Sequence, residues 1–123
     1  MSKPVAPAIA TNNPVIELNI GGVVYATSLS TLTSEPSSVL TRLFGEGGTG
    51  GSGARPPKDS KGRYFVDRDG VFSRYVLDYL RSRRLVLPEA FGEKQRLRQE
   101  AEYYGLTGLV RSVQPSENNV VRV

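Results

Sequence analysis

Two short β-prone runs joined by a glycine pair constrain the fold more than any other feature of the sequence. Residues 15–20 (VIELNI) alternate apolar and polar side chains, and residues 23–27 (VVYAT) are rich in β-branched and aromatic residues. Alternation with a period of two is typical of a strand with one buried face. Gly21 and Gly22 lie between the runs and tolerate the positive φ that a two-residue hairpin turn requires. The sequence therefore predicts an antiparallel hairpin near the start of the chain.

Helical periodicity dominates the second half of the chain. Residues 70–82 (GVFSRYVLDYLRS) repeat apolar side chains at helical spacing, and Asp69 is expected to cap that helix. A second helix is predicted over residues 93–104. After Gly105, one or two more helical turns are expected, carrying Leu106, Leu109 and Val110.

Shorter elements complete the predicted secondary structure. A helical turn is expected around Leu29 and Leu32, and a helix that starts near Pro36 should carry residues 39–44. Residues 64–66 predict a third strand, and residues 85–87, ended by Pro88, predict a short edge strand. The result is an α+β (mixed α/β) chain with a small sheet of short strands and four or five helices.

Residues 15–112 are predicted to form the folded domain. Residues 1–14 are expected to be a flexible lead-in, and the glycine-rich residues 45–57 a flexible loop within the domain. Residues 113–123 are expected to be a tail or linker. One core is therefore expected for a chain of 123 residues.

The composition excludes several kinds of chemistry. The chain has no cysteine and no histidine, so disulfides, thiolate or imidazole metal sites and histidine-based triads are ruled out. Residues 55–111 hold 13 Lys/Arg and 8 Asp/Glu, and the two signs are interleaved, which favours a solvated face over nucleic-acid binding. No apolar run approaches the ~18 residues of a membrane span. We expect a cytoplasmic interaction module with no catalysis and no cofactor.

Three motifs suggest other functions. Gly48–Gly53 matches the G-x-G-x-x-G dinucleotide pattern, but it follows a helix and leads into prolines, which favours a linker over a nucleotide-using enzyme. Asp67–Gly70 begins like a calcium loop, but Val71 and Phe72 occupy the next ligand and glycine positions. Val120–Val123 would suit strand addition to a PDZ-type domain if the chain ends there.

Aromatic and basic side chains in the predicted helices suggest a partner-binding surface and a cluster of cations at a helix C-terminus. Tyr103 and Tyr104 are adjacent and must point in different directions, so one of them should lie at the surface; with Phe44, they form the predicted partner surface. The cluster of Arg81, Arg83 and Arg84 is interpreted as cations that complement a helix C-terminus.

Three segments in order resemble the potassium-channel-tetramerisation type of BTB/POZ domain found in the KCTD family. The first is residues 19–22 with Tyr25, Thr27 and Thr31–Leu32, the second is residues 64–70 and 74–81, and the third is residues 100–106. The resemblance spans residues 15 to about 111. It implies a BTB fold that self-assembles into a homo-tetramer or homo-pentamer, and a protein that continues into a further domain. Ser73 departs from the family pattern, since an aromatic is common at that position.

The charged residues around the third predicted strand suit such an assembly. Both signs lie side by side there, as head-to-tail contact between different patches of identical subunits requires. The predicted polar interface residues are Arg63, Asp67, Arg68, Asp69 and Arg74.

The resemblance implies two possible roles. One branch of the family contains auxiliary subunits of GABA-B receptors that modulate G-protein signalling and would be recruited to a membrane receptor tail. The other contains substrate adaptors of cullin-3 ubiquitin ligases. Residues 58–63, 77–81 and 87–93 are closer to the receptor-associated branch, and the cullin-3 adaptor remains the alternative.

Overall fold

The computed structural model describes residues 13–45 and 55–113. Strands β1 (Val15–Ile20) and β2 (Val23–Ser28) form the predicted antiparallel hairpin, paired residue by residue from Val15–Ser28 to Ile20–Val23. Gly21 and Gly22 have φ of 59° and 102°, the left-handed conformations that this turn requires.

Strand β3 (Tyr64–Val66) is the predicted third strand and pairs parallel to β1, giving the order β2-β1-β3. A parallel pair needs a long crossover connection. Helices α2 and α3 lie within it.

In the described residues, five helices pack with this sheet, and four or five were predicted. Their bounds are α2 Leu29–Leu32, α3 Val39–Phe44, α4 Ser73–Ser82, α5 Lys94–Tyr104 and α6 Thr107–Ser112. The hydroxyls of Ser28 and Ser38 each accept a hydrogen bond from a backbone N–H three residues on, at 3.2 Å, and so cap α2 and α3.

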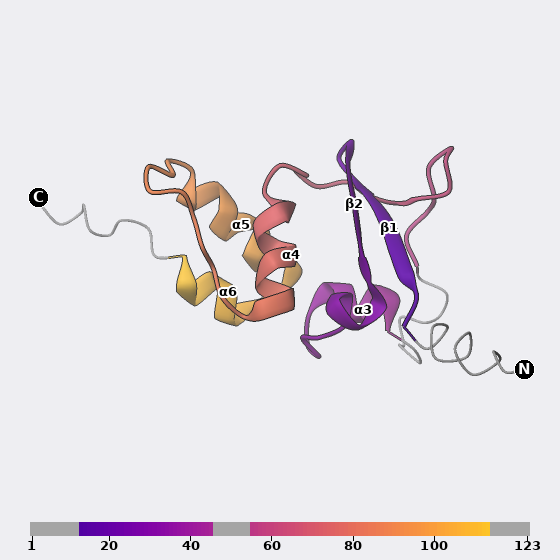
Figure 1. Cartoon of the computed structure of the whole chain (residues 1–123), viewed down its shortest axis with the longest axis horizontal. Helices are drawn as coiled ribbons and strands as arrows, with labels where there is room; N and C mark the ends of the chain where they lie inside the picture. The colour runs from indigo at the N-terminus through magenta and orange to yellow at the C-terminus, as the bar shows by residue number, and fades with distance from the viewer. Residues whose placement is uncertain (1–12, 46–54, 114–123) are drawn as a thin grey trace, which may run out of the picture.

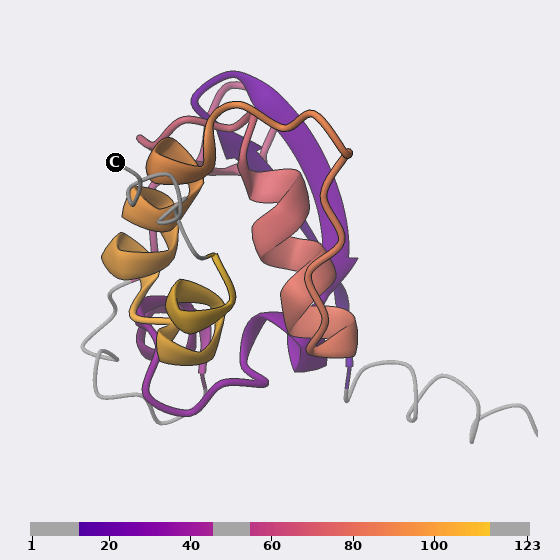
Figure 2. The same ribbon diagram turned by 90° about the vertical axis from the view of Figure 1, so that its left-hand side faces the viewer.

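The core lies between the sheet and the helices. Figure 1 shows the sheet on one side of α4 and helices α5 and α6 on the other, and Figure 2 shows the same elements surrounding a common interior. The inward face of β1 contributes Ile16, Leu18 and Ile20, which are all buried. Helices α4 and α5 supply most of the opposing surface. One core therefore joins the hairpin at the start of the chain to the helices at its end.

One predicted element is wrong. Residues 85–87 follow α4 as an extended segment that pairs with no strand of the described chain. Leu85 and Leu87 pack against the core and Val86 is 80% exposed, so the segment alternates like a strand without belonging to the sheet.

Some predictions fall outside the described residues. These are the lead-in up to residue 12, residues 46–54 of the glycine-rich loop with their G-x-G-x-x-G match, and the tail from residue 114 onward.

Candidate interaction surface

The turn between β3 and α4 (Asp67–Phe72) packs backbone to backbone against the hairpin turn. Gly21 N–H donates to Val66 O at 2.9 Å, and the Tyr25 hydroxyl donates to Gly70 O at 2.7 Å. A Cβ at Gly21 would overlap the Arg68 carbonyl oxygen, and one at Gly70 would overlap the Ile20 carbonyl oxygen. The Gly21–Gly22 turn and the Asp67–Gly70 motif therefore pack directly against each other, and each needs a glycine at the contact.

Arg68 binds partners within its own subunit. Its Nε and Nη2 donate to the two carboxylate oxygens of Glu100 on α5, at 3.0 and 2.9 Å, and its guanidinium lies 4.0 Å from the Tyr103 ring centroid. Glu100 is 7% exposed, and its hydrogen bonds hold the pKa of Arg68 above the ordinary value. The bidentate contact thus gives Arg68 a role within the subunit and uses two of its five N–H donors, and its interface role stays a prediction.

Asp69 also has partners within the chain. Its Oδ1 accepts from Val71 N–H and its Oδ2 accepts from Arg96 Nη2, both at 3.0 Å. Helix α4 begins later, at Ser73, and the residue before it, Phe72, makes no side-chain cap. The prediction that Asp69 caps α4 is therefore wrong: it closes a turn three residues earlier and ties that turn to α5.

The remaining three predicted interface residues have fewer partners within the described subunit. Arg63 Nε lies 3.8 Å from Glu17 Oε1, a loose ion pair. Asp67 is exposed and has no hydrogen-bond or ion-pair partner among the described residues. Arg74 is also exposed; its guanidinium lies 5.9 Å from the Tyr75 ring centroid and makes no ion pair with the described residues. Asp67 and Arg74 are therefore charges that the described part of the subunit leaves unpaired.

The predicted partner surface needs correction at two of its three residues. Phe44 is fully buried and packs edge-to-face on Tyr64, with centroids 5.3 Å apart. Tyr104 is 1% exposed, and burial raises the pKa of its phenol far above the ordinary value. Neither ring offers surface to a partner, because helix periodicity turns both toward the core. Tyr103 is 44% exposed, which confirms that one of the adjacent tyrosines lies at the surface.

Ser73, where the family pattern has an aromatic, is buried next to this core. Its hydroxyl lies near the Tyr104 phenol and lowers the phenol's pKa, although burial has the larger effect. Neither hydroxyl completes a well-formed hydrogen bond. Two buried hydroxyl groups are therefore incompletely satisfied at this position.

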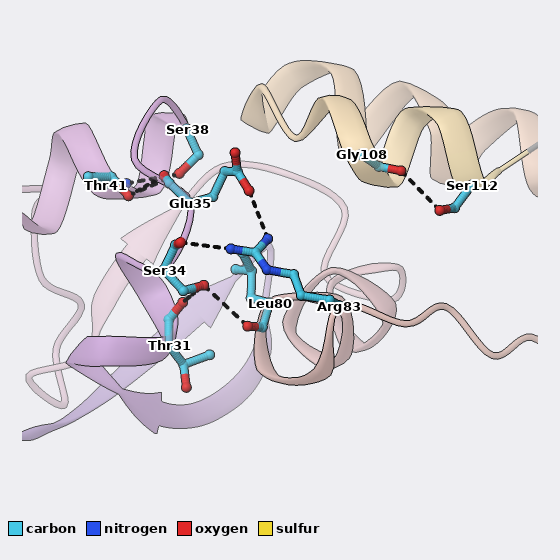
Figure 3. Close-up of polar contacts among 9 residues, drawn as sticks. All are labelled: Thr31, Ser34, Glu35, Ser38, Thr41, Leu80, Arg83, Gly108 and Ser112. Atoms are coloured by element: carbon cyan, nitrogen blue, oxygen red, sulfur yellow. Dashed lines mark hydrogen bonds and ion pairs between the residues drawn. The ribbon is translucent and has the colours of Figure 1, made fainter.

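Arg83 makes a connection that sequence reasoning missed. It follows α4 with φ of 62° and is the only non-glycine residue with positive φ in the described chain. Figure 3 shows its guanidinium reaching the α2–α3 connection, where Nη1 donates to Glu35 Oε1 and Nη2 to Ser34 O, both at 2.7 Å. The basic cluster was interpreted only as a complement to the helix dipole. Its specific partner lies 48 residues away in the sequence.

Glu100 and Asp59 are two further residues that the sequence did not single out. Asp59 accepts from Asn19 Nδ2 at 2.8 Å and from Lys61 N–H and Arg63 N–H, which lowers its pKa below the ordinary value. The signal for Asp59 was present, since an aspartate followed by Ser-Lys-Gly is typical of an Asx turn. No local pattern marks Glu100.

A metal-binding cluster and a membrane-spanning helix are both missing from the described residues. Residues 13–45 and 55–113 contain no group of three or more acidic side chains placed to hold a metal ion. In the same ranges, no helix has the length and apolar character needed to cross a membrane.

Comparison with known proteins identifies the family to which this architecture belongs. The three-stranded sheet, the five helices and the paired glycine turns are those of a BTB/POZ domain, and the family model for that domain matches residues 16–113. The chain is 47% identical over 103 residues to the BTB/POZ domain-containing protein KCTD21 of both Mus musculus and Homo sapiens. The chain thus belongs to the BTB/POZ family, in its potassium-channel-tetramerisation, or KCTD, group. These matches cover 83% of this chain but 37% of each relative.

Proposed function

We propose that this domain is a homo-oligomerising interaction scaffold that assembles head to tail into a tetramer or pentamer. The observation that carries the proposal is a pair of unpaired charges on either side of a well-tied segment: Asp67 begins the turn, and Arg74 lies in the first turn of α4. Asp67 and Arg74 are exposed, while the residues between them are held by Glu100, Arg96 and Tyr25. A rigid turn that presents both charge signs fixes the register between identical subunits, although rim charges add little affinity.

Light scattering at several protein concentrations tests the proposal. A stable mass of four or five chains is expected for the wild type, and a strict monomer would contradict it. Asp67→Arg reverses one of the two charges and is expected to weaken assembly while circular dichroism stays unchanged. Asp78→Arg is the matched control, because Asp78 is also exposed and already pairs with Arg81 at 3.1 Å.

For the partner, we propose that the assembly is a cytoplasmic auxiliary subunit recruited to a receptor tail. Support comes from the sequence around Lys58–Arg63 and Leu77–Arg81, which resembles the receptor-associated branch. The exposed Tyr103, stacked on the Arg68 guanidinium, offers a rigid aromatic contact. Binding to an immobilised GABA-B receptor cytoplasmic tail, with Tyr103→Ala as the variant, tests this role.

The alternative partner is cullin-3, for which the chain would serve as a substrate adaptor. Pull-down of cullin-3 at micromolar concentration by the intact oligomer would favour this alternative. Retention of the receptor tail without cullin-3 would favour the auxiliary role. Neither role involves a reaction catalysed by this domain.

A further inference from the structure

The two edges of the sheet differ in how they are covered. The outer side of β3 is closed by the chain that precedes it, since Phe65 N–H donates to Pro57 O and Asp59 N–H donates to Arg63 O, both at 2.7 Å. Strand β2 pairs with β1 alone among the described residues. One edge of the sheet is therefore closed, and the β2 edge is open.

The hairpin register identifies the backbone groups on the open edge. The two-residue turn closes on the pair Ile20–Val23, and antiparallel pairs alternate between hydrogen-bonded and non-hydrogen-bonded. Val24 and Ala26 are opposite Asn19 and Glu17 in the non-hydrogen-bonded positions. Their N–H and C=O groups therefore point away from β1, toward the open edge.

Strand β2 lacks the features that usually protect an edge. Val23–Ser28 contains no charged residue and no proline, and its register with β1 runs without a bulge. Val24 is 49% exposed and Ala26 is also exposed. Sheet edges that are not meant to pair usually carry lysine, proline or a bulge. This edge is thus suited to receiving another strand.

A matching extended segment occurs after α4. Leu85 and Leu87 face their own core, Val86 points outward with 80% exposure, and none of the three donates or accepts a backbone hydrogen bond within the described chain. The segment is uncharged, like β2. A hollow of mixed polar and apolar lining, bounded by Leu85, Leu87, Pro88, Glu89, Lys94, Ser112 and Val113, lies beside it.

The two features cannot meet within one subunit. Figure 1 shows β2 on one side of α4 and the orange segment that follows α4 on the other side. Each subunit thus has one open edge and one unpaired extended segment, at different places on its surface. Complementary but separate patches are the requirement for a heterologous contact, which closes into a ring when the rotation allows.

We propose that Leu85–Leu87 of one copy adds as a strand to the β2 edge of the next copy, next to Val24 and Ala26. This inference rests on the proposed self-assembly and names the surfaces that carry it. Pairing would satisfy backbone groups that are now open to solvent and would bury Val86 without removing any charge from water.

Hydrogen exchange of the full chain, followed residue by residue by NMR, is the first test. In the assembled protein, the amides of Val24, Ala26 and Val86 are expected to exchange at least about tenfold more slowly than in dilute monomer, because they become hydrogen-bonded. An assembled protein in which these amides stay unprotected would overturn the inference and leave self-assembly standing. A protein that is monomeric at every concentration would overturn the self-assembly proposal itself.

Paired variants provide the second test. Ala26→Pro removes one of the two outward donors on the open edge, and Val86→Pro removes one donor of the segment; each is expected to weaken assembly by about tenfold or more. Val15→Lys, at a valine that is 70% exposed on β1, is the control and should assemble normally. If Ala26→Pro fails to fold by circular dichroism, Ala26→Lys replaces it, since an edge lysine blocks pairing without altering backbone donors.

A mixture of the two variants then separates the proposed contact from symmetric pairing. Ala26→Pro keeps an intact segment and Val86→Pro keeps an intact edge, so together they can restore one contact. A one-to-one heterodimer that does not extend to a ring is expected. Failure of the mixture to dimerise, when each variant is folded, would overturn the inference.

Discussion

Helix α4 is entered and left by two segments that are held in opposite ways. The turn before it, Asp67–Phe72, is fixed by polar contacts to two other elements: Arg68 and Asp69 bind α5, and Gly70 binds β2. The segment after it, Arg84–Pro88, is held mainly by the burial of Leu85 and Leu87. Specific polar partners thus fix the backbone conformation of the first segment within the subunit. Apolar anchoring of the second segment leaves its backbone N–H and C=O groups available for a partner.

The largest expected effect is at Gly70, in the tied turn. Gly70→Ala places a methyl group against the Ile20 carbonyl and 2.7 Å from the Val23 Cβ, which the surrounding backbone cannot accommodate. We expect a loss of about 3 kcal/mol in the free energy of unfolding, measured by urea denaturation. Gly92→Ala, after α4, is the control: a Cβ there meets nothing within 4 Å. Equal stability of the two variants would contradict the close backbone contact.

Loss of the carboxylate that holds Arg68 should have the next largest effect. Glu100→Ala leaves a half-buried guanidinium without its bidentate partner and is expected to destabilise the domain by about 2–3 kcal/mol. Glu102→Ala removes an exposed carboxylate that lies 3.5 Å from Arg98 and should cost less than about 0.5 kcal/mol. Thermal unfolding distinguishes the two, and a similar cost for both would show that Arg68 does not need its partner.

The third prediction concerns backbone strain at Arg83, which joins α4 to the Arg84–Pro88 segment. Arg83→Ala loses both hydrogen bonds to the α2–α3 connection and keeps a left-handed backbone, whereas Arg83→Gly loses the same bonds but adopts that backbone freely. We therefore expect the glycine variant to be more stable than the alanine variant by about 1 kcal/mol. Chemical denaturation of the two proteins side by side measures the difference; an alanine variant as stable as the glycine one would contradict it.

The smallest effect concerns pH. The pKa of Asp59 is lowered from its ordinary value of 3.8, chiefly by the hydrogen bond from Asn19. Its contribution to stability is therefore complete above pH 3.8 and is lost as the pH falls through the lower, folded-state pKa. Asp59→Asn should remove this component from the acid limb of the stability profile, followed by circular dichroism. An unchanged acid limb would show that the carboxylate does not stabilise the turn.

Local patterns account for most of the fold. The hairpin, β3, α2, α3 and α5 follow the prediction closely, because alternation, helical spacing and capping serines act over a few residues. The contacts of the candidate interaction surface were less predictable. Arg68 and Glu100 are 32 residues apart, and no local period relates them. The adjacent Tyr103 and Tyr104 were rightly expected to diverge, but which of them lies inside depended on how α5 packs.

Local residue patterns fix where the chain turns, which stretches are helical or extended, and that Leu85–Leu87 alternates like a strand. They also carry the family resemblance, because the glycine turns and the Asp67–Gly70 motif are local. Packing of distant elements is what pairs Asp69 with Arg96 instead of with the start of α4, pairs Arg68 with Glu100, and leaves the strand-like segment with no strand beside it in the described chain. The physical reason is that local propensity depends on neighbouring residues, whereas ion pairs and strand pairing depend on which distant groups the core brings together.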